Sequence, residues 1–157
     1  MEYFVVKWLH ILSSTLLFGT GIGTAFYLFF ISRSDDVRTI AAVARLVVIA
    51  DWCFTATSIV VQPVTGFYLA KLMGLPLDAP WLAWSIGLFA VAAACWLPVV
   101  WLQMRMRDIA VAAARAGEPL PPSYRRHFRA WTALGFPALF SLLAVFYLMV
   151  AKPNLGS

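Results

Sequence analysis

His10 is one of only two histidines in the chain, and it stands inside a long apolar stretch near the N-terminus. An ionisable side chain in such a stretch is costly to bury, so it invites a functional hypothesis. A neutral imidazole can ligate a haem iron, or it can simply form a local hydrogen bond. The residue type by itself leaves both interpretations open.

The residues that follow His10 favour a ligand-binding face. Ser14, Leu17 and Gly21 lie four, seven and eleven positions further along, on the same side of a helix. Their small and partly polar side chains would leave room for a flat macrocycle. Gly19 and Gly23 form a G-x-x-x-G motif, which is also typical of close packing between two helices.

Three other features bear on this chemistry. If His10 binds iron, the second axial position could be taken by water or by one of Lys71, Met73, Tyr147 and Met149. His127 is expected near the opposite membrane face, too far from His10 to share one haem, as an interfacial residue or as part of an anion site. Asp51 is the only carboxylate in the apolar part of a span, and we expect it to pair with Arg45 or with the arginines around His127; a proton relay is the alternative.

The amino-acid composition indicates that these residues are positioned by a membrane-spanning fold. Of 157 residues, 62% are hydrophobic and 12% are charged, whereas soluble domains are about 45–50% apolar. Apolar segments long enough to cross the bilayer occupy about residues 5–31, 45–72, 81–104 and 128–150. We therefore predict an all-α, four-helix integral membrane bundle that forms one transmembrane domain over residues 1–157. The first segment lacks a basic region and a cleavage site, so it is expected to be a retained helix.

The distribution of basic residues predicts the orientation of the protein in the membrane. Four crossings put both termini on one side, which carries Lys7, Lys71 and Lys152. The other side carries nine arginines, namely Arg33, Arg38, Arg45, Arg105, Arg107, Arg115, Arg125, Arg126 and Arg129. The positive-inside rule makes the arginine-rich side cytoplasmic and places both termini in the periplasm of a bacterial inner membrane. Tryptophans are expected to mark the two interfaces, with Trp8, Trp81 and Trp84 on the lysine side and Trp52, Trp101 and Trp131 on the arginine side.

Several function classes have no support in the sequence. It contains no glycine-rich phosphate loop, no H-E-x-x-H and no cluster of cysteine and histidine, which excludes the common nucleotide, hydrolase and zinc motifs. Cys53 and Cys95 are far apart in apolar stretches and are expected to be small packing residues. The basic residues flank hydrophobic spans, so the net charge of +5 indicates a lipid surface as partner and not nucleic acid.

Short motifs spread over the chain resemble the HemJ family, small bacterial membrane proteins that oxidise protoporphyrinogen IX. The likeness extends to CopD-like proteins and to an uncharacterised family of predicted four-helix membrane proteins. It is carried by Val6-Lys7-Trp8-Leu9-His10-Ile11, Thr65-Gly66-Phe67-Tyr68-Leu69, Trp81-Leu82, Phe136-Pro137-Ala138-Leu139 and Val150-Ala151-Lys152-Pro153.

The resemblance implies a b-type haem whose axial ligand is His10, and a role for Lys152 at the same membrane face. Lys7 and Lys71 could join Lys152 in meeting the propionates. Where HemJ-like proteins carry a Pro-Arg pair late in the first helix, this chain has Ala25-Phe26, so an arginine suited to a porphyrin carboxylate is missing. Haem binding is therefore better supported than oxidase activity.

Three functional hypotheses follow. The first is a haem protein that transfers electrons or acts as a protoporphyrinogen-oxidase-like oxidoreductase, with a porphyrin or a quinone as its small-molecule partner. The second is a cofactor-free accessory subunit that uses Gly19 and Gly23 to form a homo-oligomer or to bind another membrane subunit. The third is a transporter for a small solute or copper, centred on the proline at position 63.

Overall fold

Four long apolar helices dominate the computed structural model, which describes residues 1–153. The first is α1 (Glu2–Ile31). The second is α2 (Val37–Ala50), which passes through a π-helical segment, η1 (Asp51–Thr55), into α3 (Ala56–Leu72). The third and fourth are α4 (Pro80–Ala116) and α5 (Pro122–Ala151). Each of the four is long and apolar enough to cross a membrane, which confirms the all-α, four-span prediction.

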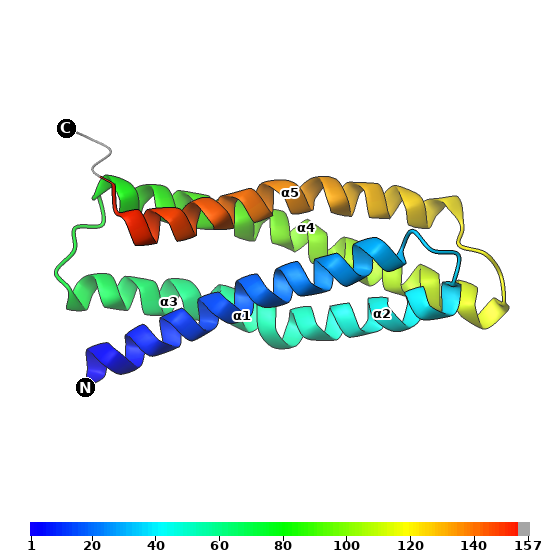
Figure 1. The fold of residues 1–157 in the computed structure, drawn as a ribbon, viewed down its shortest axis with the longest axis horizontal. Helices are drawn as coiled ribbons and strands as arrows, with labels where there is room; N and C mark the ends of the chain where they lie inside the picture. The colour runs from blue at the N-terminus through cyan, green and yellow to red at the C-terminus, as the bar shows by residue number, and fades with distance from the viewer. Residues whose placement is uncertain (154–157) are drawn as a thin grey trace.

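The helices alternate in direction, so the first residues of α1 and the last of α5 lie at one end, together with the α3–α4 connection (Figure 1). The α1–α2 and α4–α5 connections, with the arginines around them, lie at the other end. We call these the lysine end and the arginine end. At about 1.5 Å per residue, the 37 residues of α4 extend about 55 Å, so this helix projects well beyond a hydrocarbon core of about 30 Å.

The helix ends follow local signals. Gly117 has a φ of 69° and terminates α4, because this left-handed conformation suits glycine. Asp36 caps α2 and accepts a hydrogen bond from the backbone N–H of Thr39. The Thr39 hydroxyl bonds the same carboxylate, and these two bonds hold the pKa of Asp36 below its usual value. Proline 63 lies inside α3 and does not end this helix. The irregular turn of the second span is the π-helix between α2 and α3.

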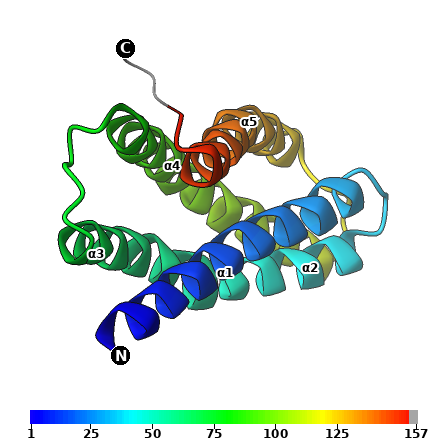
Figure 2. The same cartoon turned by 60° about the vertical axis from the view of Figure 1, so that its left-hand side comes forward.

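The helices form two layers (Figure 2). In one layer α1 packs along α2, η1 and α3, and in the other α4 packs along α5. The layers are joined mainly where α2 meets α4 near the arginine end. The main buried cluster lies there, around Leu28, Ile40, Leu102, Met106 and Tyr124. Tight packing at this end leaves room between the layers toward the other end.

Candidate functional site

A cavity of about 460 Å³ lies between the two layers at the lysine end. Its walls are mostly apolar, and its polar side chains include His10, Ser14 and Gln62 from the first layer and Ser85 from α4. Its volume lies within the range of about 300–1,000 Å³ that is usual for ligand sites. We call it the His10 cavity.

The His10 ring is held by α3. Its Nδ1 lies 2.8 Å from the Thr65 hydroxyl, which itself donates to the backbone carbonyl of Val61 at 2.7 Å. A hydroxyl has only one proton, and a carbonyl can only accept. With the Thr65 proton on the Val61 carbonyl, Nδ1 carries the ring proton and donates it to Thr65, and this assignment of the tautomer leaves the lone pair of the imidazole on Nε2, a nitrogen through which histidine binds metals.

Further contacts between α1 and α3 fix the position of this ring. Ser13 donates a hydrogen bond to the Gln62 side-chain oxygen, and Tyr68 bonds Glu2. A Cβ atom at Gly66 would lie 3.2 Å from His10 Cε1, which is tighter than an ordinary carbon contact. Only a glycine at this position lets the imidazole rest directly on the α3 backbone.

Four of the six predicted binding residues border this cavity, namely Lys7, His10, Ser14 and Lys152. Lys7 and Lys152 are exposed at its mouth, and the ammonium of Lys152 lies 5.5 Å from the centre of the Trp81 ring, another cavity residue. Lys71 is exposed and lines neither of the two cavities described here. Gly21 lines the second cavity, not this one.

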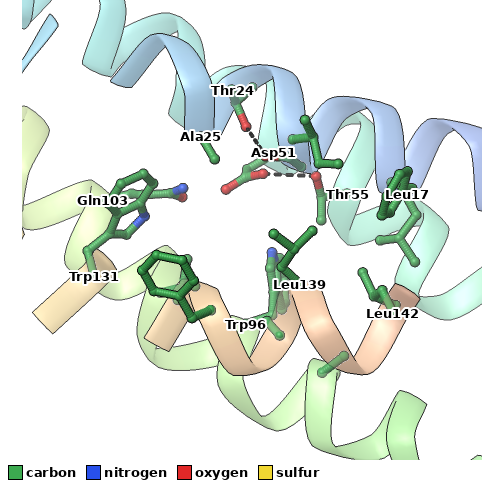
Figure 3. A pocket seen from close by; sticks show the side chains of 18 of the residues that line it. Leu17, Thr24, Ala25, Asp51, Thr55, Trp96, Gln103, Trp131, Leu139 and Leu142 are labelled. Carbon is green, nitrogen blue, oxygen red and sulfur yellow. Dashed lines mark hydrogen bonds between the residues drawn. The ribbon is translucent and has the colours of Figure 1, made fainter. Parts of the chain in front are cut away.

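The second cavity, of about 510 Å³, lies deeper between the layers and is lined by Asp51 and by residues of all four spans. We call it the Asp51 cavity. Asp51 begins the π-helix and is 4% exposed. Its Oδ1 accepts a hydrogen bond of 2.8 Å from Thr55, and Figure 3 shows both side chains at the cavity wall. Extra residues in a helical turn often mark functional sites.

The prediction of an ion pair for Asp51 is wrong. Within residues 1–153 the one salt bridge joins Arg107 and Asp108, and Asp51 Oδ2 has no hydrogen-bond partner. Asp51 lines a cavity inside the bundle, whereas the predicted partners Arg45, Arg126 and Arg129 are exposed.

Other polar side chains converge on the same cavity. Figure 3 shows the Gln103 amide directed toward Asp51, and Trp96 and Trp131 line the same cavity. The indole nitrogens of both tryptophans are buried without a partner among the described residues. Trp131 is 6% exposed, so it does not belong to the interfacial belt in which the sequence analysis placed it. Sequence reasoning missed Thr55, Trp96 and Gln103 because nothing in their spacing links them.

The two cavities are neighbours. Leu17, Phe18, Phe89 and Leu142 line both of them, so one layer of apolar side chains separates the His10 cavity from the Asp51 cavity. This arrangement places an imidazole and a carboxyl in successive compartments along the same interlayer space.

The remaining sequence candidates lie elsewhere. His127 Nδ1 bonds the Ser123 carbonyl at 2.7 Å, and its ring packs on Trp101 at the arginine end. Added Cβ atoms at Gly19 and Gly23 would meet no atom within 4 Å, so this motif does not pack closely against another of the helices that the structure describes. The described residues hold no group of three or more histidine, cysteine, aspartate or glutamate side chains that could bind a metal ion.

Fold and cavities together define a four-helix integral membrane protein with a mostly apolar space between two helical layers, bordered by a few polar side chains. A family described as predicted integral membrane proteins, DUF2269, matches residues 4–153, and the chain belongs to it. No curated protein and no solved structure matches the chain.

Proposed function

We propose that the protein is a haem-binding electron-transfer protein of the bacterial inner membrane, with a b-type haem in the His10 cavity and His10 as its axial ligand. The observation that carries this proposal is the Nδ1 bond to Thr65, which leaves Nε2 as the unprotonated ring atom. Haem-ligating histidines are characteristically fixed in this way through the opposite nitrogen. The HemJ resemblance points to the same residue and the same cofactor.

The cavity residues fit this group. The apolar walls would exclude water from the macrocycle, and the small side chain of Ser14 leaves space one turn along the helix from His10. Lys7 and Lys152 at the mouth would bind the two propionates, whose negative charge their ammonium groups neutralise. Bound haem would supply a one-electron redox centre.

A second axial ligand is available from the same cavity. Met73 and Met149 line it, whereas the exposed Lys71 and Tyr147 do not. If a methionine also held the haem, its thioether would raise the reduction potential relative to a second nitrogen ligand. We propose Met149, on α5, because it reaches the cavity from the layer opposite His10.

The test is an absorption spectrum of the detergent-purified protein after expression with ample haem, oxidised and dithionite-reduced. Wild-type protein should show a Soret band that is lost in His10→Ala and kept in His127→Ala, the matched control at the other end. Circular dichroism and gel filtration check the fold of both variants. A wild-type protein without a Soret band, or an unchanged band in His10→Ala, would refute the proposal. Turnover of protoporphyrinogen then tests the reaction class suggested by the HemJ resemblance.

A second function is favoured by one observation. Within residues 1–153, added Cβ atoms at Gly19 and Gly23 of the G-x-x-x-G motif would meet no neighbour, and Gly19 is exposed. We propose as the alternative an accessory subunit that docks a second helix on Gly19 and Gly23. Gly19→Leu would then abolish co-purification with a partner or with a second copy, whereas Ile22→Leu on the same helix would not.

A further inference from the structure

Three buried polar atoms lack a hydrogen-bond partner among the described residues, and all three belong to side chains that line the Asp51 cavity. They are Asp51 Oδ2, Trp96 Nε1 and Trp131 Nε1. Unpaired buried donors and acceptors are rare because each one loses its hydrogen bonds to water without replacement. Three in one cavity indicate that something in the cavity supplies their partners.

These atoms come from three different elements. Asp51 is on the π-helix, Trp96 on α4 and Trp131 on α5, so both layers contribute. The Thr55 bond orients the Asp51 carboxyl, and the buried Gln103 adds an amide beside it (Figure 3). Because packing holds Asp51 and Trp131 at 4% and 6% exposure, the polar atoms cannot simply turn toward solvent.

The chemistry of the set defines the ligand. Indole N–H groups only donate, so they require oxygen acceptors, whereas a carboxyl group accepts from a quinol hydroxyl when it is ionised and donates to a quinone carbonyl when it is protonated. The rest of the wall is apolar and aromatic, including Phe29 and Phe89. The complementary molecule has a flat apolar ring with oxygen atoms on its edge. We propose that the Asp51 cavity binds the headgroup of a quinone or quinol taken from the bilayer.

Access from the lipid supports this class of ligand. Phe26, Phe30 and Phe136 line the cavity, and each of these side chains is more than half exposed. A membrane-soluble molecule can therefore reach the cavity laterally, with its isoprenoid tail left among the acyl chains. A lipid tail alone would leave all three polar atoms unpaired, and water would have to occupy a largely apolar space. The site does not depend on the haem proposed above.

The experiment measures binding of decyl-benzoquinone, and of its reduced quinol, to the protein in lipid nanodiscs. Empty nanodiscs provide the baseline for partition into lipid. Wild-type protein should bind both forms saturably above this baseline, and decylbenzene, which has the same tail but no oxygen, should not compete. Trp131→Phe removes one hydrogen-bond donor. Asp51→Leu removes the carboxyl and replaces it with an apolar side chain, which is compatible with the apolar residues around it. Each should weaken binding about tenfold or more, the usual effect of losing one buried hydrogen bond.

Trp101→Phe is the matched control, because Trp101 lies on α4 with its side chain exposed and outside the cavity. It should bind quinone like the wild type. Gel filtration and helical circular dichroism establish that each variant folds. If Trp131→Phe does not fold, the binding measurement on Asp51→Leu decides the test. Retention no greater than in empty nanodiscs overturns the proposal. Equal competition by decylbenzene, or wild-type affinity in Asp51→Leu, overturns it as well.

Discussion

Replacing Thr65 by valine is the sharpest perturbation of the His10 site. Valine keeps the β-branched shape of threonine but removes the hydroxyl that accepts the Nδ1 proton of His10 at 2.8 Å. The helix should persist, because the bond from this hydroxyl to Val61 is an addition to the regular backbone ladder. The substitution therefore frees the imidazole without removing it.

The size of the effect follows from the role of the bond. Loss of a partner that orients a metal-ligating histidine typically weakens metal affinity about 10- to 100-fold. This corresponds to about 1.4–2.7 kcal/mol, at about 1.36 kcal/mol for each factor of ten. Without haem, the same substitution removes one ordinary hydrogen bond, worth about 0.5–1.5 kcal/mol of stability. Thr65→Val should therefore impair haem binding more than it impairs folding.

The assay is a haem titration of purified apoprotein, followed at the Soret band, together with thermal unfolding of the apoprotein. Thr65→Ser is the matched control, since it restores the hydroxyl and should bind haem nearly as well as the wild type. His10→Ala defines the level of non-specific binding. Wild-type haem affinity in a folded Thr65→Val protein would refute the assigned tautomer and its function, and so would a Thr65→Ser protein as weak as Thr65→Val.

Three more predictions concern the same fold. Gly66→Ala should push the His10 ring from its place, because the new Cβ would lie 3.2 Å from Cε1, and the haem spectrum should shift or weaken. Met106→Ala should lower the free energy of unfolding by about 2–5 kcal/mol in a denaturant titration, because Met106 is 0% exposed in the main cluster. Asp36 has its pKa lowered by the Thr39 bonds, so its contribution to stability is present at neutral pH and is lost as the pH falls through the folded-state value. The difference in melting temperature between wild type and Asp36→Asn should therefore shrink on acidification.

Each of these has its own control. Gly87→Ala, where an added Cβ would meet nothing, should leave the haem spectrum unchanged. Leu97→Ala, at an exposed site on α4, should cost far less stability than Met106→Ala. A pH-independent gap between wild type and Asp36→Asn would contradict the capping argument.

Much of the architecture could be predicted from the sequence because it depends on the properties of short, local segments. A run of about 20 apolar residues must cross a bilayer wherever it occurs, and glycine 117 ends a helix through its own backbone conformation. His10 could be singled out for the same reason, since a histidine inside an apolar stretch is rare. The grouping of His10, Ser14, Lys7 and Lys152 at one end followed from helix periodicity and the alternating directions of the spans.

Tertiary structure alone decided which polar groups meet. His10 and Thr65 are 55 positions apart, and no pattern in either segment reveals that one accepts the proton of the other. The ion pair of Asp51 was predicted from its position near the arginine-rich side of the membrane, whereas in the folded bundle its carboxyl lines the Asp51 cavity and Arg45 is exposed. Trp131 was assigned to the interface by its depth, but packing between the layers buries it.

Hydrophobicity along the chain thus determined that this protein has four membrane spans, since span formation depends only on the transfer of a local segment from water to lipid. The cavities, and the polar atoms that face them, depend on how closely the two layers approach at each depth. That distance is set by side chains from all four spans at once, including the tight cluster around Met106 that leaves the lysine end open. No single segment carries this information, so it exists only in the folded bundle.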